Sequence, residues 1–357
     1  MSNKDYTKGR GAQFNTHNRF EKNELSRVHE EGIDLPPDFE AYNTQIIKQY
    51  PKTIVNKVVS EDIPLEYSMN PYQGCEHGCI YCYARPTHEY WGYSAGKDFE
   101  SKIIVKQNAV ELLRKFLSRK KYEPKPIMLS GNTDCYQPIE KQLEHTRQLL
   151  QCMDEFRQPV GIITKNALVR RDIDILKSLA KDNLVKVNIS LTTLSNDLHH
   201  KLEPRTAAPA LRLKTIEALS KENIPVGIMM APVIPGLTDN EIPEVLKAAS
   251  EAGAISAAYT LLRLNGAVEP LFQDWIEKNY PNKAQKVMNA TAASHGGSVS
   301  DNRIGKRMGG EGELAKLIRK LFASQWQKYF SDKPEVKLNT KAFRVPDKSG
   351  QLNLFDE

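Results

Sequence analysis

Short apolar runs alternate with amphipathic segments from about residue 64 to residue 265. The runs have the length and composition of strands that are buried on both faces, as in parallel sheets; they are 65–69, 127–131, 160–164, 185–191, 225–231 and 256–262. Apolar positions at helical spacing mark the segments between them: 107–119, 139–153, 170–180, 208–221 and 239–252. Successive βα units of this kind predict an α/β fold, a partial (βα)6 barrel, with an open doubly wound sheet as the alternative.

The pattern changes on both sides of this core. The sequence predicts an irregular N-terminal arm over 1–60, the core over 61–265, a helical extension over 266–335 and a flexible tail over 336–357. The helices of the extension are predicted over 268–279, 282–293 and 313–330. A glycine-rich loop precedes the last of them, and because it lacks the spacing of a phosphate-binding loop, it favours a mobile or substrate-facing loop.

Three cysteines, Cys75, Cys79 and Cys82, lie within eight residues of one loop, NPYQGCEHGCIYCYA. This loop follows the first predicted strand, and active sites of parallel α/β folds lie at the carboxyl ends of their strands. Three thiolates this close together predict a metal site. A structural zinc ion or a fully ligated cluster needs four protein ligands, so this site has one coordination position left for another molecule.

Composition sets broader limits. The hydrophobic fraction of 40% and the charged fraction of 26% are ordinary for a soluble globular protein. No stretch reaches the ~18 apolar residues of a membrane-spanning helix, and the polar start is no signal peptide. Five cysteines, three of them clustered, favour a metal site in a reducing compartment over a set of disulfides. We therefore expect a cytoplasmic protein.

Positive charge is unevenly distributed along the chain. The net charge is +6, and residues 301–344 hold eleven Lys or Arg against five Asp or Glu. A second basic run covers 102–125. Such segments suit a polyanion such as nucleic acid, although a solvated charged surface has the same composition.

The CxxxCxxC spacing of Cys75, Cys79 and Cys82, with the aromatic Tyr81 inside it and a βα series after it, resembles the radical S-adenosylmethionine (SAM) superfamily. A zinc site is the alternative for the same cysteines. The resemblance implies a partial barrel and a 4Fe-4S cluster on the three thiolates, with the fourth iron bound by the amino and carboxylate groups of SAM. It also implies an electron donor such as flavodoxin or ferredoxin, and reductive cleavage of SAM to a 5′-deoxyadenosyl radical that abstracts a hydrogen atom.

Further site residues follow from the resemblance by position. Tyr81 is expected near the adenine of SAM. After the second strand the family has a Gly-Gly-Glu stretch that binds the methionine amino group, whereas this chain has Ser130-Gly-Asn-Thr-Asp134. There Gly131 can allow a close backbone approach, and Asn132 or Asp134, or the threonine between them, can accept from the ammonium.

The fourth strand and the segment after it carry two more candidates. In the family this region meets the ribose and carboxylate of SAM, so Ser190 and Arg205 are the expected contacts. A guanidinium is well suited to a carboxylate because it can donate two parallel hydrogen bonds. The alternatives are a helix-capping serine and a surface arginine.

Within the superfamily, the segments CEHGCIYCYARP, TDCYQPIE and LEPRT resemble the branch related to spore photoproduct lyase, which includes an enzyme that reverses a DNA lesion. That enzyme uses a cysteine as hydrogen donor. Cys135 is the positional candidate here, with a small buried residue as the favoured alternative. Cys152 is predicted to lie in the core.

Two other groups of residues contain side chains that can bind metal or transfer protons. His77, His199 and His200 lack partners at metal-ligand spacing, which favours surface histidines. Asp134 and Glu140 could imitate an acid/base pair, but they are related only by proximity in sequence.

The last seven residues, QLNLFDE, resemble the peptide with which bacterial DNA-processing proteins bind the sliding clamp. Gln351 would make polar contacts, and Leu352, Leu354 and Phe355 would fill an apolar pocket. The alternative is a tail that packs on its own domain. If the peptide does bind the clamp, the basic segment from Arg303 to Arg344 becomes a candidate phosphate-contacting surface.

These observations favour a radical SAM enzyme that acts on nucleic acid, in DNA repair or modification. Two alternatives stay open at this point. One is a non-catalytic, metal-stabilised nucleic-acid-binding protein, and the other is a radical SAM enzyme that acts on a peptide or a small metabolite.

Overall fold

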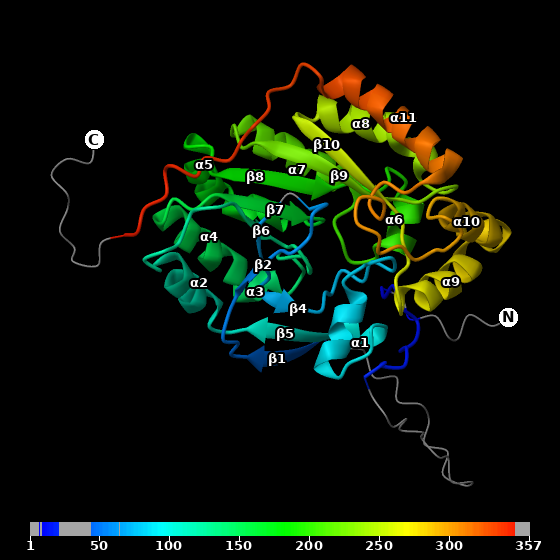
Figure 1. Cartoon of the computed structure of the whole chain (residues 1–357), viewed down its shortest axis with the longest axis horizontal. Helices are drawn as coiled ribbons and strands as arrows, with labels where there is room; N and C mark the ends of the chain where they lie inside the picture. Colours follow the sequence, from blue (N-terminus) through cyan, green and yellow to red (C-terminus); the bar gives the residue numbers. More distant parts are fainter. Residues whose placement is uncertain (1–6, 8, 21–43, 64, 347–357) are drawn as a thin grey trace, which may run out of the picture.

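The structure is a computed structural model that describes residues 7, 9–20, 44–63 and 65–346 (Figure 1). Its main sheet has seven strands in the order β10-β9-β8-β7-β6-β3-β2. Six of these are parallel: β3 (Tyr67–Met69), β6 (Ile127–Leu129), β7 (Val160–Thr164), β8 (Val185–Ser190), β9 (Val226–Val233) and β10 (Ser256–Leu261). A doubly wound sheet reverses its strand order at a switch point, and these strands follow sequence order throughout. The predicted partial barrel is confirmed.

Each predicted helix of the core is present on the outside of this sheet (Figure 1). These helices are α2 (Ala109–Leu117), α4 (His145–Glu155), α5 (Ile173–Lys181), α7 (Pro209–Lys221) and α8 (Ile242–Glu251). The segment predicted as one helix over 139–153 is divided into α3 (Glu140–Leu143) and α4. Glu144 separates them with a left-handed φ of 53°. The backbone amide of Thr146 then donates to the Glu140 carboxylate at 3.1 Å, which stabilises the break.

A second, three-stranded sheet has the order β1-β5-β4. Its strands are β1 (Gln45–Gln49), β5 (Lys102–Lys106) and β4 (Tyr72–Gln73). The sequence predicted no regular element before residue 60, but β1 and the edge strand β2 (Val55–Lys57) both lie there. Both strands are largely exposed and lack a buried face, so they leave no apolar pattern that a sequence could reveal.

The C-terminal helices follow the prediction closely. They are α9 (Val268–Asn279), α10 (Pro281–Ala293) and α11 (Gly312–Phe330). Helix α11 packs on α8 and β10, where the rings of Phe322 and Tyr259 lie 4.5 Å apart. It thereby covers the end of the sheet beside β10 (Figure 1), which protects that edge from other strands.

The segment after α11 returns to the main core. Backbone amides of Asn339 and Arg344 donate to the carbonyls of Asn183 and Phe156 at 2.9 Å each. Phe343 packs against the core beside Tyr122. The prediction placed a flexible tail from residue 336, whereas this part of it is held against the sheet domain. Within the described residues, no helix is long and apolar enough to cross a membrane.

Candidate active site

The cysteine loop lies just after β3 and β4, at the carboxyl edge of the parallel strands. The side chains of Cys75 and Cys79 are buried, each 7% exposed, and Cys82 is half-buried. Cys82 packs against both small apolar clusters that contain the other two cysteines. A short 3-10 helix, η2 (Arg85–Trp91), begins directly after the loop. The three thiols therefore share one small region of the molecule.

Two glycines allow the loop to turn this tightly. Gly74 and Gly78 both have left-handed backbones, with φ of 79° and 67°, a conformation that costs glycine little and other residues more. A Cβ added at Gly78 would lie 2.9 Å from a carboxylate oxygen of Glu100. The Glu100 carboxylate thus lies directly against the backbone of the loop, and a side chain at position 78 would displace it.

A segment near the start of the chain, residues 10–12, lies directly on the cysteine loop; we call it the N-terminal strap. Its amides at Gly11 and Ala12 donate to the buried Glu100 carboxylate at 3.1 and 2.7 Å. The same carboxylate pairs with Arg85 at 2.5 Å, and the Arg85 Nε donates to the Cys79 carbonyl at 3.0 Å. One buried ion pair therefore connects the strap to the loop that carries the cysteines.

On its other side, the loop is joined to the segments that follow the next strands. The Glu76 carboxylate accepts from the amide of Ile139 at 2.6 Å and lies 3.4 Å from the Arg205 guanidinium. The Nδ1 atom of His77 lies 3.3 Å from the Asp134 carboxylate, and its Nε2 atom lies 3.2 Å from the side-chain amide nitrogen of Asn166. Because these partners follow β6, β7 and β8, the loop is joined to the segments after three neighbouring strands of the partial barrel.

Burial shapes the chemistry of the thiols. It raises the pKa of Cys75 well above the ordinary value, and the nearby Asp134 carboxylate adds to that rise. The pKa of Cys79 is raised by burial too, against the opposing effect of the Lys165 ammonium. A thiolate at these positions thus needs a strong cationic partner, and iron in a cluster provides one because coordination deprotonates a thiol.

The donor set fits an iron-sulfur cluster. No three His, Cys, Asp or Glu side chains in the described part of the chain form a ready site for a single metal ion. A 4Fe-4S cluster is larger, each thiolate binds a different iron, and cysteine sulfur is its usual ligand. The three cysteines supply three such ligands from one tightly wound loop.

Asp134 lies at the mouth but has several partners already. It accepts from Thr164 Oγ1 and the Lys165 amide, both at 2.8 Å, and from the Tyr136 amide at 2.9 Å, besides its contact with His77. Burial would raise its pKa, but His77 and these hydrogen bonds lower it to about 2. The structure thus places Asp134 as an ionised connection between the cysteine loop and the loop after β7.

The other candidates after β6 border the cysteine loop. The Gly131 carbonyl accepts from the hydroxyl of Tyr83 at 2.7 Å, and the Asn132 amide donates to Asn70 Oδ1 at 2.9 Å. A Cβ at Gly131 would lie 2.9 Å from the Cβ of Ser68. A side chain at position 131 would therefore crowd Ser68. Contact of either residue with SAM stays a prediction.

Tyr81 is buried in a polar network that the sequence did not reveal. Its hydroxyl donates to the Glu203 carboxylate, which also pairs with Arg212. The Lys165 ammonium lies 5.8 Å from the centre of the Tyr81 ring. Burial would raise the pKa of Glu203, but Arg212 and Lys165 lower it to about 2. In the sequence, Glu203 stands out only as part of the segment LEPRT, and no local motif marks Lys165 or Arg212.

Ser190 and Arg205 lie at the same mouth. Ser190 is buried at the end of β8, where its carbonyl accepts from Arg212 at 2.9 Å. Arg205 stands beside Glu76, inside the cysteine motif. The structure thus brings both residues to the region predicted for SAM, and their contacts with the ribose and the carboxylate stay predictions.

The two remaining cysteines lie in the main hydrophobic core. Cys135 is fully buried, its amide donates to Ser130 Oγ at 2.7 Å, and burial raises the pKa of its thiol. This position agrees with the favoured interpretation as a small buried residue, and a role as hydrogen donor stays a prediction. Cys152 is buried in the same core, as predicted.

The prediction of surface histidines was wrong for two of the three. His77 is 1% exposed and His199 is 2% exposed, whereas His200 is exposed. His77 is buried because it joins Asp134 and Asn166, and His199 because it joins Thr206 at 2.8 Å.

The two members of the possible acid/base pair have different direct partners. The Glu140 carboxylate contacts Arg171 at 2.6 Å and Tyr72, neither of which contacts the Asp134 carboxylate directly. The two carboxylates therefore serve different structural connections.

Comparisons with known proteins agree with this site. Residues 69–249 match the Radical SAM superfamily. An uncharacterised protein of Mycobacterium tuberculosis is 34% identical over 233 residues, which cover 64% of this chain and 68% of that protein. A protein of Pseudomonas phage M6 named radical SAM Nα-GlyT isomerase is 27% identical over 172 residues, 48% of this chain and 34% of that protein.

Among solved structures, a variant of spore photoproduct lyase shares the fold with a TM-score of 0.57 at 17% identity, over 80% of each chain. The family match covers the cysteine loop and most of the parallel strands. Members of this family are enzymes that use a 4Fe-4S cluster and SAM, and the chain belongs to the radical SAM superfamily.

Proposed function

We propose that this protein holds a 4Fe-4S cluster on Cys75, Cys79 and Cys82, binds SAM beside it, and abstracts a hydrogen atom from a nucleic-acid substrate. The observation that carries this proposal is the position of three thiols, two of them buried, at the carboxyl edge of six parallel strands. The cluster, when bound, supplies the electron that cleaves SAM to a radical. The protein's own residues position SAM and keep water from the radical.

Different residues around the loop are proposed to contact different parts of SAM. Tyr81 is proposed to border the adenine, held in one orientation by Glu203. Gly131 and Asn132 border the methionine end, where Asp134 acts by fixing the cysteine loop through His77.

Ser190 and Arg205 are proposed to contact the ribose and the carboxylate. The side chain of Arg205 is about a third exposed, and its partner Glu76 is at 3.4 Å, so the guanidinium has donors left for a carboxylate.

Nucleic acid is the substrate class that several features support. The shared fold includes spore photoproduct lyase structures that contain a dinucleoside spore photoproduct. The chain carries a net charge of +6, and cationic surfaces attract phosphate backbones. We place the reaction in DNA repair or modification, in the cytoplasm, where flavodoxin or ferredoxin would supply the electron.

The clamp-like peptide fits this proposal. Gln351, Leu352, Leu354 and Phe355 lie outside the described residues, so their role rests on sequence alone. We propose that they bind the bacterial sliding clamp and bring the enzyme to DNA. Deletion of residues 351–357 should abolish clamp binding in a pull-down with purified clamp, and equal binding by the truncated protein would refute this part.

Anaerobic reconstitution tests the chemistry. We expect roughly four irons per chain and release of 5′-deoxyadenosine when the protein is reduced with SAM. Cys75→Ala should lose the cluster, whereas Cys152→Ala, which removes a buried cysteine outside the loop, should keep it. Stoichiometric zinc without SAM cleavage would refute the enzyme.

Deuterium tracing tests the substrate class. The reduced enzyme is offered deuterated DNA, RNA, peptides and metabolites, and 5′-deoxyadenosine is analysed for deuterium by mass spectrometry. Transfer from DNA or RNA supports the proposal. Transfer from a peptide or a metabolite alone would overturn the nucleic-acid assignment and leave the radical SAM chemistry standing.

A further inference from the structure

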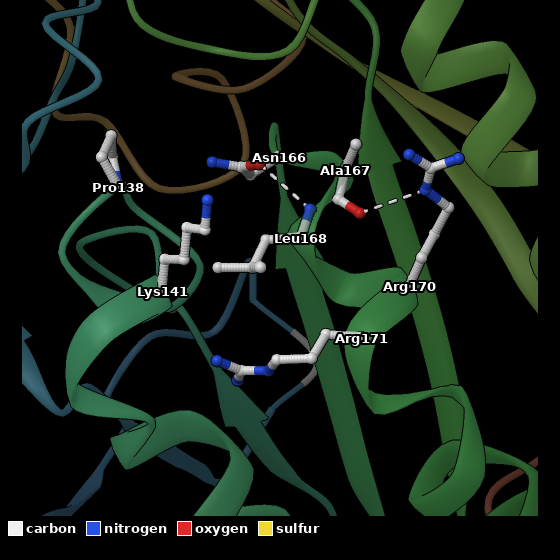
Figure 2. Close-up of a pocket in the computed structure, with 7 residues that line it drawn as sticks. All are labelled: Pro138, Lys141, Asn166, Ala167, Leu168, Arg170 and Arg171. Atoms are coloured by element: carbon white, nitrogen blue, oxygen red, sulfur yellow. Dashed lines mark hydrogen bonds between the residues drawn. The ribbon is translucent and has the colours of Figure 1, made fainter.

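A cavity of about 590 Å³ is lined by residues of the segments that follow β6 and β7 (Figure 2). Three of its lining residues are cationic, namely Lys141, Arg170 and Arg171. The amide side chain of Asn166 lies on the same side as Lys141, with Leu168 below them in the view. The residues that line the pocket in the described part of the chain include no carboxylate. We call this cavity the basic pocket.

The basic pocket belongs to the mouth of the partial barrel. Asn166 follows the carboxyl end of β7, and its side chain is 3.2 Å from His77 in the cysteine loop. One side chain therefore separates the pocket from the loop that carries the cluster ligands. A ligand in the pocket would be held beside the loop that carries the cluster ligands.

The three cations of the pocket differ in how far they are neutralised. Arg171 is compensated by buried carboxylates, Glu140 at 2.6 Å and Asp172 at 2.8 Å. Lys141 and Arg170 are exposed, and in the described structure neither has a carboxylate within ion-pair distance. The Arg170 Nε donates to the Ala167 carbonyl at 3.3 Å, which orients its guanidinium. Two cations of the basic pocket thus have no carboxylate partner among the described residues.

Several cations of the basic segment near the C-terminus, unlike Lys141 and Arg170 of the basic pocket, are paired with carboxylates. Arg303 pairs with Asp301 and Glu311, Lys306 pairs with Glu311, and Arg307 pairs with Asp62. These cations serve to hold the glycine-rich loop. They are therefore less suited to bind phosphates than the segment's charge count suggests.

We propose that the basic pocket binds the phosphodiester backbone of the nucleic-acid substrate, with Lys141 and Arg170 as the phosphate contacts. This inference rests on the proposed nucleic-acid function and locates the phosphate contacts of the substrate on the protein. Cations that have no carboxylate partner in the described structure can neutralise a phosphate without breaking an ion pair, and each such contact releases condensed counter-ions from the nucleic acid. Asn166 can add a neutral hydrogen bond, and Pro138 and Leu168 offer apolar contact to a sugar. Such contacts fix position without reading sequence, so they would hold one nucleotide at the mouth.

The salt dependence of oligonucleotide binding tests this site. A short fluorescein-labelled single-stranded oligodeoxynucleotide is titrated with the full-length protein at several salt concentrations, and fluorescence anisotropy gives the dissociation constant. The double variant Lys141→Gln/Arg170→Gln should bind more weakly, with a slope of log K against log salt that is smaller by about 1 to 1.5, about 0.7 for each lost contact.

A charge-matched control is available at the amino ends of the parallel strands, opposite the mouth. Lys115 and Lys181 are exposed near the ends of α2 and α5, which lead into the amino ends of β6 and β8. Lys115→Gln/Lys181→Gln should keep the wild-type slope. If the pocket variant fails to fold, Lys141→Gln alone gives the same test with about half the change in slope.

The outcomes separate the two proposals. Wild-type binding with an unchanged slope in the pocket variant overturns the basic pocket and leaves the nucleic-acid function standing. Absence of salt-dependent binding by the wild type overturns both. Equal displacement of the oligonucleotide by polyglutamate at matched charge would show a site for any polyanion and overturn the assignment to nucleic acid.

Discussion

The backbone amide of Gly11 donates to the Glu100 carboxylate at 3.1 Å, so a residue near the start of the chain shares a partner with the cysteine loop. The same carboxylate holds Arg85, which in turn donates to the Cys79 carbonyl. The N-terminal strap is therefore part of the framework of the cluster site. Its role can be tested without touching a cysteine.

Gly11→Ala should disrupt the cysteine loop. A Cβ at this position would lie 1.8 Å from the Gly78 carbonyl oxygen, so strap or loop must move. We expect a loss of about 1–3 kcal/mol in stability, typical of overpacking, and a lower iron content after reconstitution. Thermal unfolding and iron analysis measure both effects.

Gly309→Ala is the control for that substitution. Its added Cβ would meet only the end of Arg319, at an ordinary 3.5 Å. Iron content equal to wild type in Gly11→Ala would show that the strap does not shape the loop.

Glu100→Gln should destabilise the fold strongly. The substitution leaves the Arg85 charge buried without its partner, and breaking a buried ion pair from one side costs about 3–5 kcal/mol. Arg114→Gln breaks the pair with Glu155, whose two members are nearly half exposed, and should cost below about 1 kcal/mol. Urea denaturation of both variants gives the comparison, and similar losses in the two would contradict the prediction.

The site should lose stability in acid. Asp134 and Glu203 each have a pKa of about 2 in the folded protein, below the value of about 4 for an unfolded chain. A lowered folded pKa stabilises the fold above the unfolded pKa, and the effect is lost as the pH falls through the folded value. Each group should contribute on the order of 2 kcal/mol near neutral pH, disappearing between about pH 5 and pH 2.

Urea midpoints across this pH range measure that loss. Glu203→Gln should be less stable than wild type at neutral pH and show a flatter decline in acid, because it removes one of the two titrating groups. A decline as steep as that of the wild type would exclude Glu203 as a source of the effect.

Tyr81→Phe should weaken SAM binding. The variant keeps the ring but loses the hydroxyl that donates to Glu203. The buried carboxylate loses a partner, which costs about 1–3 kcal/mol in folding stability, and the ring is no longer held in one orientation. Calorimetric titration of the anaerobically reconstituted protein with SAM should show reduced affinity.

Tyr122→Phe provides the matched comparison for Tyr81. It removes a hydroxyl bound to Gln158 at 2.8 Å, near the amino ends of the strands, and should leave SAM affinity unchanged. Equal affinities in both variants would argue against a place for Tyr81 beside the adenine.

The parallel core could be predicted from sequence because its strands are buried on both faces. Runs such as Ile127–Leu129 and Val160–Thr164 are nearly continuous in apolar residues, and helices of ordinary amphipathic pattern separate the strands. Strand β1 carries no such signal, because most of its side chains are exposed. Its pairing with β5 is decided by a contact between segments more than fifty residues apart.

In the site, too, local patterns could be predicted from the sequence, whereas contacts between distant segments could not. The cysteines could be found because their spacing is local, and the ligand shortage pointed to a further molecule. The partners that hold the loop are distant in sequence: Tyr81 meets Glu203, and the strap meets Glu100. The histidine prediction failed for a related reason, since a buried polar residue is stable only with a partner, and the partners of His77 come from two other loops.

The segment that follows α11 determines how the molecule presents its active site. Asn339 and Arg344 are hydrogen-bonded to Asn183 and Phe156, which lie in turns just before β8 and β7, at the amino ends of the strands. The chain therefore leaves the described structure on the side away from the cysteine loop. A partner that bound residues 351–357 would therefore contact the protein on the side opposite the cysteine loop and leave the mouth of the partial barrel accessible.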